Sequence, residues 1–188
     1  LAEDVRYYGK WMRDEAEMRI GHLYPKIEIT AEMVKTRPDL KQYLGEKLTV
    51  IAWLWARTVK SPHPDFSHVD VPLISSFVLC SKKGKEVYLE PVIEGDAYRF
   101  EVKVGTPPKG AEKGTKLGRG GFRCLMSDSP IELNYIKAEG QSGQIGSHLM
   151  AIVCEGNRGR VYVAAEKKAL EAAQGAIPSW KPTGKAPA

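Results

Sequence analysis

Apolar residues recur at helical spacing over the first twenty or so positions of the chain. They stand three or four positions apart, with charged side chains on the opposite side of the same turns, and the apolar set is Val5, Tyr8, Met12, Ala16, Ile20 and Leu23. Gly21 and Pro25 end the pattern. We therefore expect an amphipathic helix over residues 2–21, whose apolar side docks on the chain's own strands or on another protein surface.

Two shorter helices follow before the first strand. Residues 30–35 begin with a threonine cap, and residues 38–44 open on a proline and close at Gly45. These residue types favour helix ends, because a hydroxyl oxygen satisfies a free backbone N–H and proline has no N–H to satisfy. With the first helix they form a predicted helical arm over residues 1–47.

The pattern changes to strands from residue 48 onward. Residues 48–59 are apolar on both faces, which predicts a central strand covered on each side. Trp53 and Trp55 share one face of it, where core packing is favoured over stacking on a nucleobase. Short turns join the next three segments into a predicted antiparallel meander, and a hairpin follows; the strands are residues 73–80, 86–93, 98–104, 149–154 and 160–164.

The C-terminal part is simpler in composition. Residues 165–174 are rich in alanine and predict a short helix, and the Lys, Pro and Ala residues beyond it predict a disordered tail. The fold class expected is α+β, mainly an antiparallel β-meander with an N-terminal amphipathic arm and a short C-terminal helix. We expect three parts: a helical arm (1–47), an antiparallel β domain (48–164) and a helix with a tail (165–188).

The composition is that of a soluble globular protein, with 43% hydrophobic and 27% charged residues. No apolar run is long enough to cross a membrane, and three cysteines without paired spacing suit a reducing cytoplasm. The chain begins at Leu1 inside a predicted helix, so we expect a segment of a longer protein. Much of its net charge of +5 comes from residues 57–123, with twelve basic and eight acidic side chains, which favours an anionic partner.

Two stretches concentrate this positive charge. Three lysines stand on one predicted hairpin turn, and residues 105–123 combine five basic residues with six glycines, which predicts a mobile basic loop. Such a loop follows a phosphate backbone by Coulomb attraction, or it is only a solvated connection between strands. The candidate nucleic-acid-binding residues are Arg57, Lys60, Lys82, Lys83, Lys85, Lys109, Lys113, Lys116, Arg119 and Arg123.

Two further turns, at residues 61–67 and 124–128, flank the predicted meander. With them, the chain resembles the adenine-specific DNA methylases that contain a zinc ribbon; the matching segments are residues 1–13, 19–25, 51–62, 81–85, 135–140, 149–153 and 159–162. The resemblance implies a zinc-ribbon-like topology, in which two knuckle turns hold the meander between them. In that family the two cysteine pairs of the knuckles would fall at Ser61 and Phe66, and at Cys124 and Ser127.

Only one of these four knuckle positions, Cys124, is a cysteine. A structural zinc ion needs four Cys or His ligands, so the resemblance implies a vestigial pair of knuckles without a metal. An alternative ligand set would be His63, His68 and Cys124, with Asp65 or Asp70 as a further ligand, although both histidines are also typical of ordinary surface positions.

The chain contains neither a glycine-rich turn for S-adenosylmethionine nor the Asp-Pro-Pro-Tyr motif of amino-methylases. The resemblance therefore implies a non-catalytic segment of an S-adenosylmethionine-dependent adenine-N6 DNA methyltransferase of the restriction–modification kind. This segment would engage DNA or position the target strand. No catalytic residue and no cofactor is expected here, and S-adenosylmethionine is expected for a full-length parent.

The expected partners are DNA and the methylase catalytic domain or a partner subunit. The alternative function is a structural module that packs on a catalytic domain or partner subunit without contacting DNA. Exposure of Val5, Tyr8 and Met12 would favour this alternative, because a large exposed apolar surface marks a protein contact.

Overall fold

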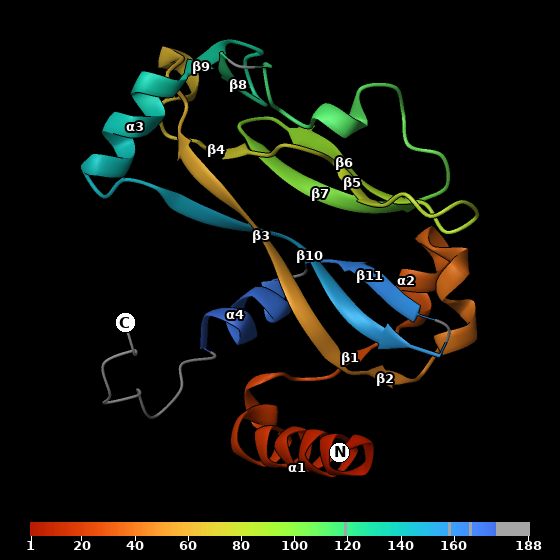
Figure 1. The fold of residues 1–188 in the computed structure, drawn as a ribbon. Coiled ribbons are helices and arrows are strands. Elements are labelled where there is room, and N and C mark those ends of the chain that lie inside the picture. The colour runs from red at the N-terminus through yellow and green to blue at the C-terminus, as the bar shows by residue number, and fades with distance from the viewer. Residues whose placement is uncertain (119, 158, 166, 176–188) are drawn as a thin grey trace.

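A computed structural model describes residues 1–118, 120–157, 159–165 and 167–175 (Figure 1). Its centre is a four-stranded antiparallel sheet in the order β11-β10-β3-β4. The strands are β3 (Val50–Lys60), β4 (Asp70–Leu73), β10 (Gly146–Gly156) and β11 (Gly159–Ala164). The central position predicted for the strand over residues 48–59 is confirmed, because β3 pairs with β10 along most of its length and with β4 at its end.

A second sheet is the predicted meander, with strands β5 (Val78–Cys80), β6 (Val87–Glu94) and β7 (Ala97–Val104) in sequence order. The predicted strand over residues 73–80 is wrong in its bounds. The chain passes from β4 in the first sheet to β5 in the second. Between them, Ile74 bonds to Thr115: the Ile74 N–H donates to Thr115 Oγ1 at 3.0 Å, and the Thr115 N–H donates to Ile74 O at 2.8 Å.

Short elements cover one face of the four-stranded sheet. They are β1 (Ile27–Glu28), α2 (Ala31–Thr36), the 3₁₀ helix η2 (Pro38–Tyr43) and β2 (Lys47–Leu48). The predicted threonine cap is confirmed, because Thr30 Oγ1 accepts the N–H of Met33 at 3.3 Å. The second predicted helix forms with 3₁₀ geometry, and its buried Leu40 and Tyr43 pack on Cys154 and other core residues of the sheet.

The opposite face of the sheet packs on the meander. Ala151, Val153 and Tyr162 from the four-stranded sheet meet Leu89 and Phe100 from the meander in one buried cluster. The central sheet is therefore covered on both faces, by short helices on one side and by β5-β6-β7 on the other (Figure 1). Trp53 stacks on Tyr24 with the ring centroids 4.7 Å apart, whereas Trp55 on the same strand is 37% exposed.

A third core lies at the far end of β3. It joins β3 and β4 to elements that include the 3₁₀ helix η3 (Pro64–Phe66), β8 (Gly121–Arg123), β9 (Pro130–Glu132) and α3 (Leu133–Gln141). β9 and α3 were not predicted from the sequence pattern. Tyr135 and Ile136 of α3 pack against this core, so the short helix closes it.

The glycine-rich segment 105–123 is not the structureless loop expected. It contains the 3₁₀ helix η4 (Ala111–Lys113) and ends in β8, and Ala111 and Thr115 are buried. Thr115 Oγ1 also donates to the carbonyl of Pro72 at 3.1 Å. A Cβ at Gly114, where φ is +54°, would lie 2.4 Å from Ile74 O, so this glycine permits the close approach to β4.

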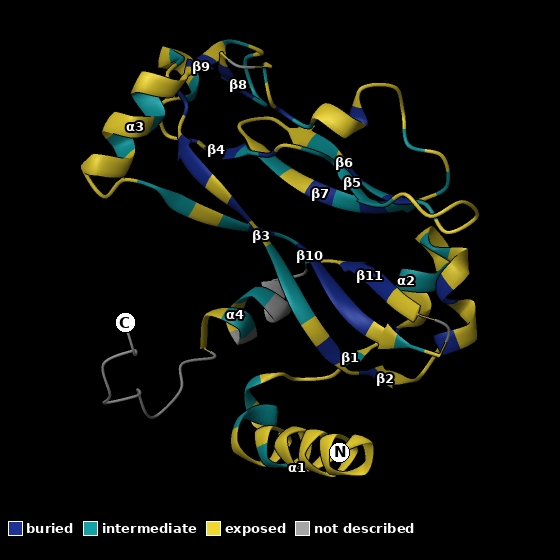
Figure 2. Cartoon of the chain, viewed as in Figure 1, coloured by how far each residue is buried: buried dark blue, intermediate teal, exposed yellow. Residues whose placement is uncertain are grey.

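The predicted N-terminal helix is confirmed as α1 (Ala2–Ile20), which η1 (Gly21–Leu23) connects to the sheet. No residue of α1 is buried, and Figure 2 shows it almost entirely in the colour of exposed residues. Its apolar side therefore does not dock on the chain's own strands. Within the described residues, no helix has the length and apolar character needed to cross a membrane.

At the other end of the chain, α4 (Lys167–Gly175) confirms the short C-terminal helix. The predicted disordered tail falls on residues 176–188, which lie outside the described residues. The fold is thus mixed helix and antiparallel sheet, with strands in the majority and a helix at the N-terminus.

Candidate nucleic-acid interface

Three predicted cations, Lys82, Lys83 and Lys85, lie on the turn between β5 and β6. The turn is closed by the Lys85 N–H, which donates to the carbonyl of Lys82 at 2.8 Å, and all three lysines are exposed. Residues of one tight turn share a surface, so the three lysines that are neighbours in the sequence also lie together in the structure.

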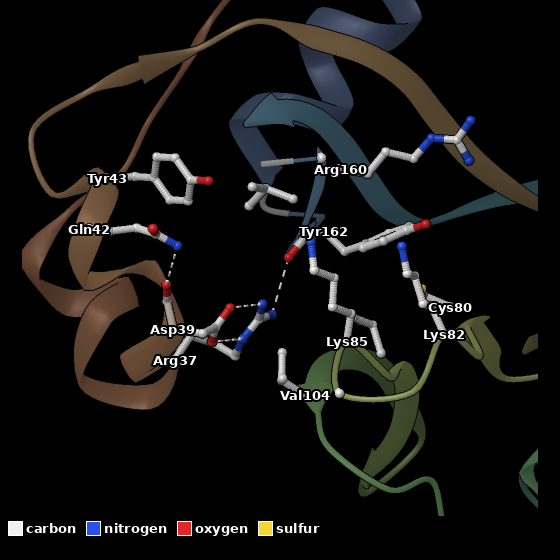
Figure 3. A pocket seen from close by; sticks show the side chains of 14 residues that line it. Arg37, Asp39, Gln42, Tyr43, Cys80, Lys82, Lys85, Val104, Arg160 and Tyr162 are labelled. Carbon is white, nitrogen blue, oxygen red and sulfur yellow. Dashed lines mark hydrogen bonds and ion pairs between the residues drawn. The ribbon is translucent and has the colours of Figure 1, made fainter. Parts of the chain in front are cut away.

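This turn faces η2 and the β10–β11 hairpin across an open cavity of about 480 Å³ (Figure 3). Lys82 and Lys85 extend from the turn toward Tyr162, and Arg160, which also lines the cavity, comes from the same strand as Tyr162. Tyr43 of η2 supplies a further aromatic ring to the lining. The cavity therefore joins three segments that are far apart in the sequence.

Arg37 is the innermost cation of this cavity, and its donors are already used. Its Nε and Nη2 donate to the two carboxylate oxygens of Asp39 at 2.7 and 2.8 Å. Its Nη1 donates to the carbonyls of Val102 and Tyr162, each at 3.1 Å. The guanidinium group thus ties η2 to β7 and β11, a geometry that arginine's fixed fork of donors permits and lysine's does not.

Two other cations of the cavity, Lys82 and Arg160, are not balanced by an acidic group among the described residues. Among the described residues that line it, Asp39 carries the one carboxylate, and that carboxylate is paired with Arg37. Within the described part of the chain, neither Lys82 nor Arg160 makes an ion pair or a side-chain hydrogen bond. Arg37 and Arg160 are not among the cations predicted from the sequence; the signal available for Arg160 was its place in segment 159–162, which carries part of the resemblance.

Several other predicted cations are neutralised by acidic neighbours. Lys60 Nζ donates to Asp70 Oδ2 at 2.9 Å and to the carbonyl of His68 at 3.0 Å. Arg123 Nη1 donates to both carboxylate oxygens of Asp128, at 3.0 and 2.8 Å. These two residues do not line the cationic cavity and have little charge left for a phosphate.

The other predicted cations are more dispersed. Arg57 is exposed on β3, and the lysines of segment 105–123 are exposed on or near η4: Lys109, Lys113 and Lys116. The segment starts beside the β5–β6 turn, because the Gly105 N–H donates to the carbonyl of Glu86 at 2.9 Å. None of these residues lines the cavity. Arg119 lies outside the described residues.

Positions that the resemblance assigns to the two knuckles meet at the third core. Ser61 Oγ lies 3.3 Å from Cys124 Sγ, and both residues are buried. Phe66 packs against the cluster that contains Cys124. The two turns, sixty residues apart in the sequence, are therefore in direct contact.

The polar surroundings of Cys124 set the ionisation of its thiol. Burial raises the pKa, but the Ser127 and Ser61 hydroxyls and the backbone N–H groups of Ser127 and Met126 favour the thiolate and lower the pKa overall. Ser127 Oγ is buried and makes no hydrogen bond of good geometry, so its effect comes from proximity, and Ser61 is the hydroxyl in contact.

The alternative metal-ligand set is not assembled. His63 Nδ1 accepts the N–H of Asp65 at 3.3 Å, His68 Nε2 lies 3.9 Å from Asp96 Oδ2, and Cys124 is buried beside Ser61. Among the described residues, no group of three or more His, Cys, Asp or Glu side chains could hold a metal ion. The knuckle positions do not fit zinc either, since Ser61, Phe66 and Ser127 are not zinc ligands.

Comparisons of the chain with protein-family models, with curated proteins and with solved structures gave no match. A function must therefore be argued from the residues and their geometry.

Proposed function

We propose that the chain is a non-catalytic, DNA-engaging segment of an S-adenosylmethionine-dependent adenine-N6 DNA methyltransferase, and that it helps to position the target strand. One observation carries the proposal: the lysines of the β5–β6 turn stand beside a cavity in which, among the described residues, Arg160 is an unpaired cation and the one carboxylate is neutralised. Such a surface attracts a phosphate backbone.

The mode of contact follows from the residue types. Lys82, Lys83 and Lys85 present flexible ammonium groups on an exposed turn, which suits contact with phosphates and not the reading of base edges. The exposed lysines of segment 105–123 extend the positive surface. This segment begins beside the turn, where the Gly105 N–H donates to the carbonyl of Glu86. The contacts would therefore fix the position of the duplex without selecting its sequence.

The zinc-ribbon-like topology belongs to the same proposal. Its support is the contact between the two predicted knuckles, where Ser61 Oγ lies 3.3 Å from Cys124 Sγ. Two sulfurs bound to one tetrahedral zinc ion are about 3.8 Å apart, given a zinc–sulfur bond of about 2.3 Å. Ser61 and Cys124, the first and third predicted knuckle positions, are thus almost as far apart as two ligands of one zinc ion. A hydrogen bond joins them in place of a metal.

A titration of labelled duplex DNA tests the proposed contact. At low salt the chain binds, and the affinity falls steeply between about 50 and 200 mM salt, because each phosphate contact releases counterions. In the variant Lys82→Gln/Lys83→Gln/Lys85→Gln, the slope of log affinity against log salt becomes shallower by about 2.7 if all three lysines contact phosphates.

The matched control changes the same amount of charge elsewhere. Lys10→Gln/Lys26→Gln/Lys35→Gln removes three exposed lysines from the helical arm. If the chain does not bind at low salt, or if the control variant loses as much affinity as the turn variant, a specific DNA-engaging surface at the β5–β6 turn is excluded.

A second candidate function is favoured by a different observation. Val5, Tyr8 and Met12 on α1 are 65%, 61% and 63% exposed, although their spacing gives the helix an apolar side. Helices without tertiary packing are marginal in water, so this side is suited to docking on a methylase catalytic domain or a partner subunit. In that case, the catalytic domain added in trans slows hydrogen exchange along α1, and the chain shows no salt-dependent DNA affinity.

A further inference from the structure

We infer that the cavity between η2, the β5–β6 turn and β11 binds an organic phosphate of mononucleotide size, with its phosphate on Lys82 and Arg160. This goes beyond contact with a duplex backbone, because it assigns a small-molecule site. The chemistry recognised is a phosphomonoester, which a free nucleotide and the 5′ end of a DNA strand both carry.

Size is the first argument. The cavity of about 480 Å³ lies within the range of about 300 to 1,000 Å³ that small-molecule sites occupy. An inorganic phosphate ion would leave most of that space to water. Apolar side chains of Val87, Val104 and Val161 form part of the lining, together with the rings of Tyr43 and Tyr162. These walls suit the sugar and base of a nucleotide, with the phosphate at the cationic rim.

Charge is the second argument. Asp39 is held by Arg37 through two hydrogen bonds of 2.7 and 2.8 Å, so it neither repels an anion nor balances the other cations. Lys82 and Arg160 have no partner within the described part of the chain. Lys82 belongs to the β5–β6 turn and Arg160 to β11, and both line the same cavity. A phosphomonoester carries nearly two negative charges at neutral pH and matches two separate cations better than a carboxylate does.

The walls are fixed before any ligand arrives. Arg37 bonds to the carbonyls of Val102 and Tyr162, and Tyr162 Oη donates to the carbonyl of Leu79 at 3.3 Å. η2 also sits close to the β10–β11 turn: a Cβ at Gly156 would lie 2.7 Å from the hydroxyl oxygen of Tyr43. Preorganised walls lower the cost of ordering the site, which favours measurable affinity for a small ligand.

The experiment uses the whole chain and calorimetric titration with AMP, adenosine and inorganic phosphate. We expect AMP to bind more tightly than adenosine or phosphate, because only AMP contacts both the rim and the walls. Lys82→Gln and Arg160→Gln each weaken AMP binding about tenfold, the effect of losing one charge-assisted hydrogen bond. Lys83→Gln is the matched control, because Lys83 shares the turn but does not line the cavity; it leaves AMP binding unchanged.

Thermal unfolding of each variant checks that the fold is intact, and Gly156→Ala provides a test without any charge change. By pushing η2 away from the β10–β11 turn, Gly156→Ala weakens AMP binding while Lys82 and Arg160 remain. The inference is overturned if Lys83→Gln weakens AMP binding as much as Lys82→Gln does.

Two oligonucleotides identify the source of the phosphate: one single strand with a 5′ phosphate and the same strand with a 5′ hydroxyl. Binding of AMP assigns the cavity to free nucleotides, and binding of the 5′-phosphorylated strand alone assigns it to strand ends. If neither AMP nor the phosphorylated strand binds at millimolar concentration, the inference is wrong. Duplex affinity is measured separately, and since Lys83→Gln weakens duplex binding but not AMP binding, the two proposals fail independently.

Discussion

The two ends of the central strand pair β3–β10 each bury a cysteine, and the two thiols behave oppositely. Cys154 pairs with Val50 at one end and is fully buried, and burial raises its pKa to about 11. Cys124 packs near Val59 at the other end and is 1% exposed, yet its pKa is lowered. Equal burial therefore does not produce equal chemistry.

The difference lies in the neighbours. Cys154 is surrounded by hydrocarbon from residues such as Ile29, Leu40 and Ile152, which disfavours the charged thiolate. Cys124 has the Ser61 hydroxyl at 3.3 Å and peptide N–H groups of its own turn. One end of the sheet surrounds its thiol with hydrocarbon, and the other places hydroxyl and peptide N–H groups beside its thiol.

The largest effect is expected from completing the knuckles. Ser61→Cys/Phe66→Cys/Ser127→Cys gives four thiols around the Cys124 position, and we expect it to bind one zinc ion. Free zinc at a thousand times the dissociation constant would raise the free energy of unfolding by about 4 kcal/mol. Urea unfolding with and without zinc measures this. Adding Cys124→Ser to the variant removes one ligand and should abolish most of the gain; equal zinc binding with and without Cys124 would contradict the proposed ribbon geometry.

Core truncations at the two ends come next. Leu40→Ala and Ile131→Ala each remove a side chain that is 1% exposed, and each should cost about 3 kcal/mol of unfolding free energy. Under native conditions, each truncation should affect mainly the end of the sheet at which the truncated side chain packs. Leu40→Ala should speed alkylation of Cys154 but not of Cys124, and Ile131→Ala should do the reverse. Mass spectrometry of the labelled cysteines distinguishes the two ends, and equal acceleration at both cysteines would show that the cores open together.

The pH dependence of stability should differ in sign between the two thiols. Because the pKa of Cys154 rises from 9.0 to about 11 on folding, its contribution is present below pH 9 and is lost as the pH rises toward 11. The loss is on the order of 2 kcal/mol. Cys124, with a lowered pKa, contributes stability that is present above pH 9 and is lost as the pH falls through its folded pKa.

Urea unfolding between pH 8.5 and 10.5 tests the contribution of Cys154. The wild-type chain should lose more stability over this range than Cys154→Ala does. If the free energy of unfolding falls equally for the wild type and for Cys154→Ala, Cys154 does not retain its proton between pH 8.5 and 10.5.

The smallest effect is expected from Ser61→Ala. The substitution removes the hydroxyl beside Cys124 Sγ and the acceptor of the His63 N–H, which lies 3.2 Å from Ser61 Oγ, and should cost about 1 kcal/mol. The pKa of Cys124 should rise, as measured by the pH dependence of its alkylation in the Ile131→Ala background. Ser76→Ala is the control, because Ser76 Oγ accepts the N–H of Val78 at 3.0 Å and is not a partner of either thiol. A Cys124 pKa unchanged by Ser61→Ala would assign the shift to the Ser127 hydroxyl and the backbone N–H groups.

Short sequence patterns predicted the helices and strands that are determined by residues close together in the sequence. The apolar spacing predicted α1, the threonine cap predicted α2, and the strand pattern along residues 98–104 predicted β7 and its hairpin with β6. The division of residues 73–80 between two sheets was not predictable in this way. It depends on bonds between Ile74 and Thr115, forty-one residues away, and no periodicity encodes such a partner.

The candidate site likewise has one part that the sequence predicts and another that depends on the tertiary structure. By itself the sequence determined that Lys82, Lys83 and Lys85 share a surface, because one tight turn holds them. Only the tertiary structure decided that Arg160 and Lys82 line one cavity and that Arg123 is neutralised by Asp128. The reason is physical: turn and helix propensities act over a few residues, whereas the charge available to a ligand depends on every group that folding brings within a few ångströms.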